Sequence, residues 1–413
     1  MLQNPLLFWY RSWWHRSGGR GSRVSGVVWC LLVPAVSAQA EDPIEMSHPV
    51  PVTVRAVMTW ATGLRLDNAP TTDRLSSRFE RSRTLYQRGM PAEALRELTP
   101  LIALSPSPES CFLRGQIRMA QAQYSFALED FDACAGTRTD GPELRYLRGV
   151  TLLHLGRPEE AIGDFDRVIG VRSESFDAFR NRAFGHYLLR NYAKAADDYA
   201  ECIRIRPADA ASYRNRALAL LHAQNFADAI DCLNVHIGYI PDDAESYFNR
   251  GMAYLRLRKW DRAITDLRRF TRLRPDDGNA WFQLSLCYMS RADREWERAD
   301  DARAAPDYAE AVATLNEATR RRRSDPAAFF NLAQACIKLA RVTEDEEPYR
   351  TAETALETFL ALAPDDRDVP AVRAQLEQIR QRRGGRAAGI TAPITPPPDG
   401  SADSGPHNAR MPR

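Results

Sequence analysis

The residues best suited to chemistry in this chain are arginines and aspartates that recur at a fixed interval. Successive arginines stand 34 positions apart, at Arg114, Arg148, Arg182, Arg216 and Arg250. A second column holds Asp130, Asp164, Asp198 and Asp266, with Cys232 in the remaining place and Asp231 one residue before it. A free arginine column would bind carboxylate or phosphate groups, whereas paired columns would tie the helices of each repeat together. We interpret the columns as structural Arg–Asp pairs.

Histidine is the other residue type that could carry chemistry. His154 and His222 occupy equivalent places two repeats apart, which would put them on one face of the molecule. A metal site there is one reading, but other repeats hold Leu or Arg at these positions, so we expect ordinary groove-lining or solvent-facing histidines. The chain has no HExxH, GxSxG or CxxC motif and no Gly-rich phosphate loop. We therefore predict a protein that is not an enzyme and has no catalytic residue, cofactor or metal site.

The elements that would position these columns follow from the same period of 34 residues. Small residues form two columns: Ala161, Ala195, Ala229 and Ala263, and Gly149, Ala183, Ala217 and Gly251. Large apolar residues form a third column, at Phe165, Tyr199, Leu233 and Leu267. Prolines form a fourth, at Pro207, Pro241 and Pro275. Small side chains let two antiparallel helices approach closely, and proline ends the second helix. Because no single repeat can bury its apolar face alone, neighbouring repeats must stack into a solenoid.

One repeat, residues 244–277, carries a recognisable signature. Its first helix holds Tyr247, Gly251 and Tyr254, and its turn and second helix hold Trp260, Ala263, Leu267, Phe270 and Pro275. This pattern resembles the tetratricopeptide repeat (TPR) family. The resemblance implies an all-α fold, a right-handed α/α superhelical solenoid of about eight helix-turn-helix repeats.

The same template divides the chain into segments. We expect a TPR domain over 75–366, with a weaker first repeat from Leu75 and regular repeats at 108–141, 142–175, 176–209, 210–243 and 244–277, which we number two to six. Repeats seven and eight carry insertions, "DREWERADDARAAP" and "RVTEDEEP", which we expect to project from the solenoid edge as a second contact surface. Residues 367–383 read as a capping helix, 41–74 as a linker or packing helix, and 384–413 as a disordered tail.

The first forty residues are typical of an export signal. A basic stretch to Arg23 precedes the apolar run "VSGVVWCLLVPAVSA", and Ala38–Ala40 has the spacing of a cleavage site. An uncleaved anchor and a misassigned start codon are the alternative readings. We predict a signal peptide over 1–40 and an exported protein, periplasmic or secreted rather than membrane-anchored.

Charge and cysteine content narrow the function further. Residues 1–40 contain several arginines and no acid, so the rest of the chain is close to neutral and has no electrostatic footprint for nucleic acid. Membrane contact is expected only through the N-terminal segment. Six cysteines lie outside that segment, at Cys111, Cys134, Cys202, Cys232, Cys287 and Cys336. We interpret them as small core residues, with disulfides as the alternative.

The TPR resemblance also implies a binding site, because the first helices of such repeats line a concave groove for peptides or partner helices. Mapped onto this chain, the groove comprises Tyr146, Arg180, Asn181, Phe184, Tyr187, Arg214, Asn215, Leu218, His222, Phe248, Asn249, Met252 and Arg256. Asn215 and Asn249 match the subclass that clamps a C-terminal carboxylate, but Phe184 and Leu218 stand where it has a further asparagine. A less specialised groove, or asparagines that only satisfy neighbouring turns, are the other readings.

These observations predict a non-catalytic scaffold that binds a peptide or partner helix in its groove. A membrane-anchored subunit of an envelope-assembly or secretion complex is the alternative function. The sequence identifies neither the partner nor the oligomeric state.

Overall fold

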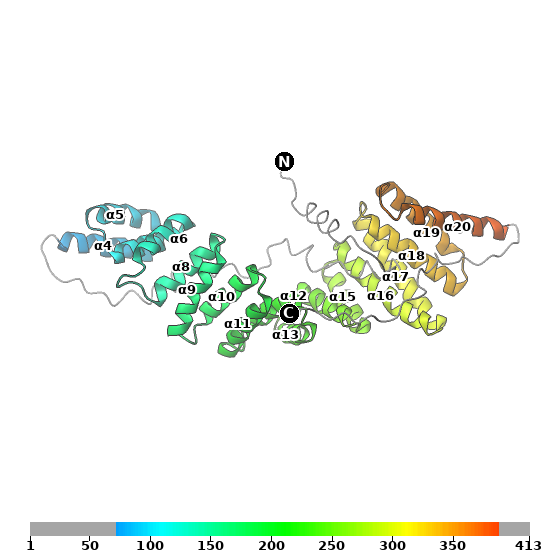
Figure 1. Cartoon of the computed structure of the whole chain (residues 1–413), viewed down its shortest axis with the longest axis horizontal. Coiled ribbons are helices and arrows are strands. Elements are labelled where there is room, and N and C mark those ends of the chain that lie inside the picture. The colour runs from blue at the N-terminus through cyan, green and yellow to red at the C-terminus, as the bar shows by residue number, and fades with distance from the viewer. Residues whose placement is uncertain (1–71, 388–413) are drawn as a thin grey trace, which may run out of the picture. The chain divides into compact units, whose positions relative to one another are not determined.

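The computed structural model describes residues 72–387, and every regular element in that range is an α-helix (Figure 1). Repeats one to three consist of α4 (Thr72–Gln87) and α5 (Pro91–Leu104), α6 (Pro108–Ala120) and α7 (Tyr124–Cys134), and α8 (Pro142–His154) and α9 (Pro158–Val171). Repeats four to six consist of α10 (Phe176–Leu188) and α11 (Tyr192–Ile205), α12 (Ala210–His222) and α13 (Phe226–Tyr239), and α14 (Ala244–Arg256) and α15 (Trp260–Leu273). Then follow α16 (Gly278–Glu297), α17 (Asp301–Arg321), α18 (Pro326–Thr343), α19 (Glu347–Leu362) and α20 (Val369–Ala387). The predicted signal segment, the linker and almost all of the tail lie outside the described residues.

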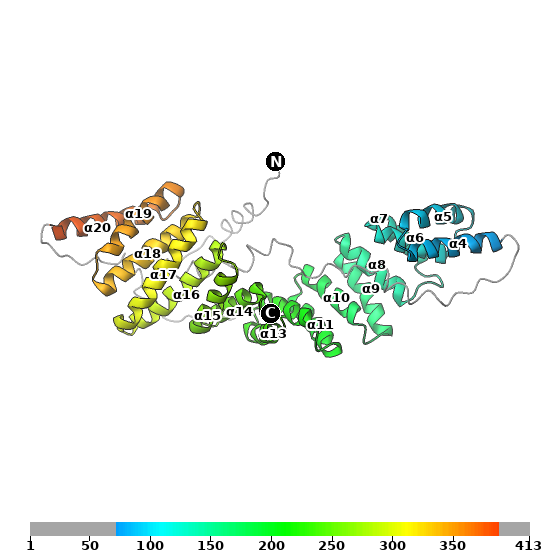
Figure 2. The ribbon, with the colours of Figure 1, turned by 180° about the vertical axis from the view of Figure 1, so that it is seen from behind.

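The described residues fall into two compact units whose boundary lies inside α16, at Arg291–Ala292. In the N-terminal unit, each helix from α4 to α15 packs on the next one along the chain (Figure 2). The first helices of some neighbouring repeats also meet, as α6 does with α8 and α12 with α14. This pairing confirms the predicted all-α solenoid.

The small-residue columns have the packing role that the sequence predicts. Ala161 is fully buried, and so are its equivalents Ala195, Ala229 and Ala263. Gly149 faces the ring of Phe165, where a Cβ atom would lie 2.9 Å from two ring carbons. Glycine therefore allows the two helices of repeat three to approach around a buried phenylalanine.

The turn inside each repeat uses a left-handed residue at a fixed place. Ala122, Arg190, Gln224 and Arg258 have φ between 55° and 61°, and Gly156, at the equivalent position in repeat three, has φ 70°. In repeat four the turn is closed by hydrogen bonds from Arg190 N to Tyr187 O (2.9 Å) and from Asn191 N to His186 O (2.8 Å). Such bonds satisfy carbonyl groups at the helix end, and only Gly156 has the residue type that adopts this conformation without strain.

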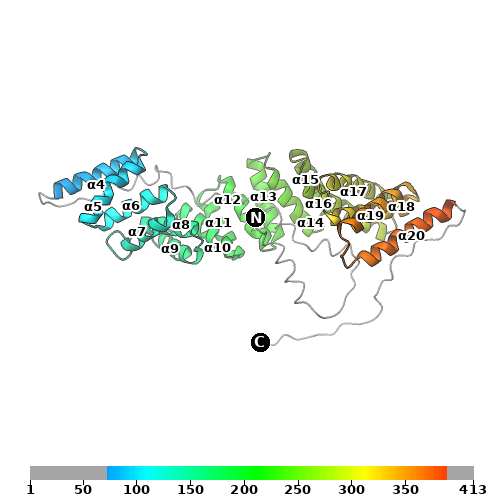
Figure 3. The same cartoon turned by 90° about the horizontal axis from the view of Figure 1, so that it is seen from above.

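The two insertions in the C-terminal part of the chain mostly lengthen helices, and their role as a second contact surface stays a prediction. The first lengthens α16 and α17, and the second lengthens α18 up to Thr343. Ala292, Ala304 and Tyr308 form a buried cluster on which Leu339 and Val342 of α18 pack. Ala304 of the first insertion therefore joins the core of the C-terminal unit, in which α17, α18, α19 and α20 follow one another side by side (Figure 3).

The helix α20 lies where the sequence predicts a capping helix. It packs on α19 and buries Val372, Leu376 and Ile379. Its Arg380 pairs with Glu353 of α19 at 2.8 Å.

Candidate protein-binding face

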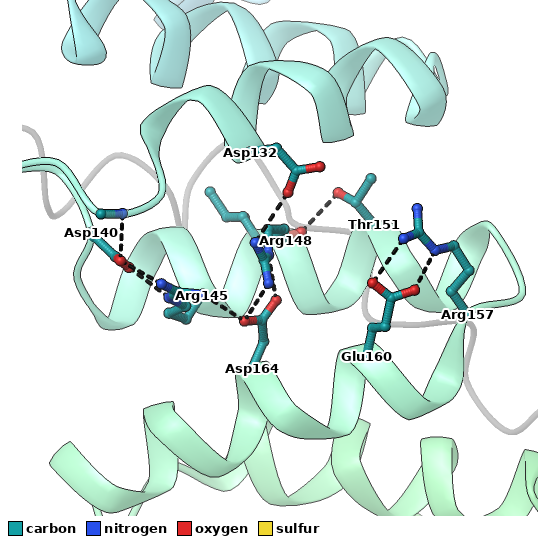
Figure 4. A network of polar contacts seen from close by, with 10 residues as sticks. Asp132, Asp140, Arg145, Arg148, Thr151, Arg157, Glu160 and Asp164 are labelled. Atoms are coloured by element: carbon teal, nitrogen blue, oxygen red, sulfur yellow. Dashed lines mark hydrogen bonds and ion pairs between the residues drawn. The ribbon is translucent and has the colours of Figure 1, made fainter.

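The most regular polar feature of the structure is a ladder of arginines, three of which contact two second helices. In repeat three, Arg148 donates from Nε and Nη2 to the carboxylate of Asp164, at 2.7 and 3.0 Å (Figure 4). Its Nη1 donates to Asp132 of the preceding repeat, at 3.1 Å. Asp164 also accepts a hydrogen bond from Arg145 at 3.2 Å. The Arg–Asp pairing that the sequence predicts is therefore present, and it extends across the boundary between repeats.

Two further repeats have the same double contact. Arg182 binds Asp198 of its own repeat at 2.6 and 2.9 Å and Asp166 of the repeat before it at 2.6 Å. Arg250 binds Asp266 at 2.7 and 2.8 Å, and its Nη1 contacts Asn234 of the preceding repeat at 2.8 Å. In repeat two, Arg114 binds both carboxylate oxygens of Asp130, from Nε to Oδ2 at 3.1 Å and from Nη2 to Oδ1 at 2.6 Å. The backward contact was not foreseen, although the exposed Asp132 and Asp166 recur with the same period.

Repeat five interrupts the ladder. The two positions that would pair with Arg216 are occupied by Ala200 and Cys232. The Nε atom of Arg216 is buried and has no hydrogen-bond acceptor among the described residues. Asp231, which the sequence offers as a substitute, forms no ion pair with Arg216 in the part of the chain that the structure describes. This arginine therefore has no carboxylate partner among the described residues.

The residues predicted to line a groove come from α8, α10, α12 and α14, and they differ in exposure. Asn181, Asn215, Leu218, Phe248 and Met252 are buried in the solenoid, with Leu218 and Met252 only 6% and 4% exposed. The rest are half-buried: Tyr146, Arg180, Phe184, Tyr187, Arg214, His222, Asn249 and Arg256. The expectation that a ligand packs against Leu218 and Met252 needs correcting, because these side chains already pack in the core. The accessible surface of this face consists of the half-buried set.

The amide of Asn181 serves its own chain. Its Nδ2 donates to the Tyr146 hydroxyl at 3.1 Å and to the Asp177 carbonyl at 3.0 Å. It thereby links repeats three and four, which fits the reading in which an asparagine satisfies neighbouring groups. The donors of Asn181 are therefore engaged within the solenoid.

Two guanidinium groups on this face are partly exposed, with the side chains of Arg180 and Arg214 at 18% and 23%. The Nε atoms of Arg180 and Arg214 are buried and lack a hydrogen-bond acceptor among the described residues. Arg180 donates from Nη2 to Asp177 at 2.9 Å, and the closest charged contact of Arg214 is Asp243, 3.8 Å from Nε. Arg180 and Arg214 occupy the same position in consecutive repeats, so together they can bind successive acceptors of a bound peptide.

An aromatic cluster lies between repeats four and five. The rings of Tyr192 and His222 stack at 4.8 Å between centroids, and Tyr187 meets both edge-on at 5.3 and 5.5 Å. Burial, helped by the positive charge of Arg190, lowers the pKa of His222 below its usual value. A neutral imidazole in an aromatic cluster suits apolar contact better than acid–base chemistry. Tyr124 and His154 stack in the same way at 4.2 Å between repeats two and three.

A second buried network lies between repeats five and six, and the sequence pattern did not predict it. His236 is 2% exposed, and its Nδ1 and Nε2 lie 2.9 Å from the Ala210 carbonyl and from the Asp243 carboxylate. Ser246 donates to the same carboxylate at 2.5 Å. Although burial alone would raise it, these hydrogen bonds and the charge of Arg214 hold the pKa of Asp243 at about 2. The nearest signal in the sequence is that repeat five alone places a histidine at this point of its second helix.

Comparison with known proteins decides the family. The sequence model of the tetratricopeptide repeat matches residues 112–177, 186–244, 248–294 and 297–357, which is more than half of the chain. The chain belongs to the tetratricopeptide repeat family. Tandem TPRs generally bind proteins or peptides and are generally non-catalytic, so this chain is a protein-interaction scaffold by its fold.

Solved TPR structures resemble this chain at low sequence identity. The C-terminal part of a TPR repeat-containing protein from Cytophaga hutchinsonii is 14% identical, with a TM-score of 0.50, over 63% of this chain and 98% of that one. A TPR protein from Parabacteroides merdae is 19% identical, with a TM-score of 0.41, over 59% and 93%. YrrB, described as a TPR protein with an unusual peptide-binding site, is 16% identical, with a TM-score of 0.41, over 49% and 96%. None of the curated proteins compared with the chain matches it significantly.

Within residues 72–387, no three His, Cys, Asp or Glu side chains gather in a way that could hold a metal ion. The six cysteines are free thiols, and all but Cys111 are buried, as a core role predicts. Burial raises the pKa of the Cys134, Cys202 and Cys336 thiols to about 12, so they stay protonated and unreactive near neutral pH. Over the same residues, no helix combines the length and the apolar character needed to cross a membrane.

Proposed function

We propose that this TPR protein is a non-catalytic adaptor that binds a peptide or helix of a partner protein on the face formed by α8, α10, α12 and α14. The observation that carries the proposal is the pair Arg180 and Arg214, one repeat apart, which bring two partly exposed guanidinium groups to this face. Guanidinium groups placed in this way hydrogen-bond carbonyl or carboxylate oxygens of an extended ligand. Phe184, Tyr187 and His222 supply apolar surface beside them, and Asn249 adds an amide.

The same proposal includes export, which rests on the basic and apolar pattern of residues 1–40. An adaptor that works outside the cytoplasm would meet its partner in the periplasm or the external medium. Cleavage after Ala40 is tested by sequencing the N-terminus of the protein purified from its own cells. A chain that begins at Glu41 supports export, whereas a chain that begins at Met1 and stays with the membranes favours the anchored alternative.

Capture of the partner tests the binding face. The full chain, tagged at its C-terminus, serves as bait in an extract of its own cells, beside a variant with Arg180→Ala, Arg214→Ala and Asn249→Ala. A control variant removes charge elsewhere, with Arg88→Ala and Arg272→Ala, two exposed arginines. Circular dichroism checks that all three proteins remain equally helical.

We expect the native bait and the control to retain the same partner, and the triple variant to lose it by at least about tenfold, since each charge-assisted hydrogen bond contributes about 1.5–3 kcal/mol. A partner retained equally by all three baits would contradict this assignment of the face. A partner lost by the control as well would show that binding depends on net charge alone.

A further inference from the structure

A second set of ion pairs recurs along the repeats, and each joins an arginine that follows the second helix to the second residue of the first helix. In repeats two, three and six these pairs are Arg138 with Glu109, Arg172 with Glu143, and Arg274 with Glu245. In repeat five both positions are apolar, Ile240 and Ala211. In repeat four the arginine is Arg206 and the acid is Asp177, whose side chain is one methylene shorter than that of glutamate.

The shorter acid leaves Arg206 without a carboxylate. The Asp177 carboxylate instead accepts a hydrogen bond from Nη2 of Arg180, at 2.9 Å. Arg206 is exposed and forms no ion pair within the described part of the chain. Because the equivalent arginines of repeats two and three are paired, this unpaired cation is a local property of repeat four.

An aromatic ring holds the Arg206 guanidinium. Its Cζ lies 4.0 Å from the ring centroid of Phe176, the first residue of α10, and that ring is buried. Arg180 lies over the same ring at 5.2 Å, so the two guanidinium groups are neighbours. A guanidinium that stacks on a ring keeps its N–H donors, which lie in its own plane, available for a carboxylate. The stacking therefore orients Arg206 without consuming its hydrogen-bond donors.

The charges around this ring favour an anionic ligand. Arg180 and Arg206 supply two positive charges, and Asp177 supplies the negative charge beside them, so the cluster is positive on balance. Asp209, three residues after Arg206, is engaged by the backbone N–H and the hydroxyl of Ser212, at 2.9 and 2.6 Å. A carboxylate from outside the chain can reach Arg206, because that side chain is exposed.

The inference rests on the proposed function and names the class of ligand. We propose that Arg206 selects peptides with an internal acidic residue, whose side-chain carboxylate it binds while the peptide lies across Arg180 and Arg214. The guanidinium donates to both oxygens of that carboxylate, as the ladder arginines do to theirs. A terminal carboxylate suits the face less well, since Phe184 and Leu218 stand where a terminal clamp has its further asparagine.

Peptides that differ in a single charge test the proposal with the full chain. A library of 12-residue peptides, acetylated and amidated at their ends and uncharged elsewhere, carries Glu, Gln or Lys at its centre. The best-retained sequence is made in all three forms, and fluorescence anisotropy measures their binding. We expect the Glu form to bind about fivefold more tightly than the Gln form, which corresponds to about 1 kcal/mol for an exposed ion pair. The Lys form should bind least tightly.

Variants of the chain test the assignment to Arg206. Arg206→Gln should remove the preference for Glu over Gln and leave the affinity for the Gln form unchanged. Arg206→Lys keeps the charge without the planar two-point geometry, so it should keep only part of the preference. Arg172→Gln is the matched control, because Arg172 holds the same position in repeat three and pairs with Glu143, and it should change nothing.

Several results would overturn the proposal. They are equal affinities for the Glu and Gln forms, no binding of any form, a Glu preference that survives Arg206→Gln, and an equal loss with Arg172→Gln. Failure of the proposed function gives a different result, in which the triple variant of Arg180, Arg214 and Asn249 binds all three forms as tightly as the native chain. If that triple variant loses all three forms while Arg206→Gln changes nothing, the binding face stands and the role of Arg206 falls.

Discussion

The guanidinium of Arg182 binds the carboxylate of Asp198 through two parallel hydrogen bonds, 2.9 Å from Nε and 2.6 Å from Nη2. The Asp198 side chain is only 8% exposed, whereas Asp166, which binds the same arginine from the preceding repeat, is 55% exposed. Geometry and burial therefore make the contact within the repeat the stronger one. The contact between repeats is the weaker, solvent-screened partner.

Replacement of Asp198 by alanine should destabilise the chain by about 3 kcal/mol, because it leaves a largely buried arginine without its main partner. Asp166→Ala is the control, and since Asp166 is exposed it should cost less than about 1 kcal/mol. Denaturant unfolding followed by circular dichroism measures both. Equal losses for the two variants would mean that burial does not govern the ladder.

Restoring the ladder in repeat five should instead stabilise the folded chain. Cys232→Asp places a carboxylate beside Arg216 and should raise stability by about 1 kcal/mol, after the cost of burying the new charge. Cys232→Asn has nearly the same shape without the charge and should not stabilise. The melting temperatures of the two variants test whether the new carboxylate stabilises the chain. A lower melting temperature for the aspartate variant than for the asparagine variant would show that Arg216 is already satisfied.

The sequence predicts this ladder well, and the reason is physical. A 34-residue period places equivalent side chains at equivalent sites, so the Arg and Asp columns had to meet if the helices paired. The interruption at Cys232 was visible for the same reason. The contact of Arg148 with Asp132 was not predicted, because it depends on how neighbouring repeats stack, which the columns within one repeat do not specify.

The small-residue columns allow a test of close packing. A Cβ atom on Gly149 would lie 2.9 Å from the buried ring of Phe165, so Gly149→Ala should cost about 1–2 kcal/mol in spite of its better helix propensity. Gly163, on the exposed side of α9, has no atom within 4 Å of such a Cβ. Gly163→Ala should therefore stabilise by up to about 1 kcal/mol. Thermal melts of the two variants should move in opposite directions, and a shift in the same direction would contradict the argument.

The buried network around Asp243 predicts a stability change in acid. Its pKa is about 2 in the folded chain and 3.8 as the unperturbed value, so the unfolded chain binds more protons between these values. The contribution of Asp243, about 2 kcal/mol, is therefore present above about pH 4 and disappears as the pH falls to about 2.

The Asp243→Asn variant provides the measurement. At pH 6 it should be less stable than the native chain by about the full amount, and near pH 2 the two should converge. Asp242→Asn, at a neighbouring aspartate that is 84% exposed, should show no such dependence. A constant difference between the native and Asp243→Asn chains from pH 6 to pH 2 would rule out ionisation as the cause.

The candidate binding face was less predictable than the fold. The TPR pattern assigned side chains to the first helices correctly, but periodicity does not tell which of them neighbouring repeats cover. Asn181, Leu218 and Met252 were expected at a ligand contact, yet all three side chains are buried. Arg180 and Arg214 stay accessible because long side chains extend past the core to its edge.

The absence of a hydrogen bond from Arg216 to the preceding repeat affects how the array of repeats is held together. In a linear stack of repeats, each junction opens or holds according to its own contacts with the next repeat. Arg148, Arg182 and Arg250 each hydrogen-bond a side chain of the preceding repeat. The equivalent partner position for Arg216 is occupied by Ala200, which has no acceptor in its side chain. The junction of repeats four and five therefore lacks this polar contact and depends on packing, such as the aromatic cluster of Tyr187, Tyr192 and His222.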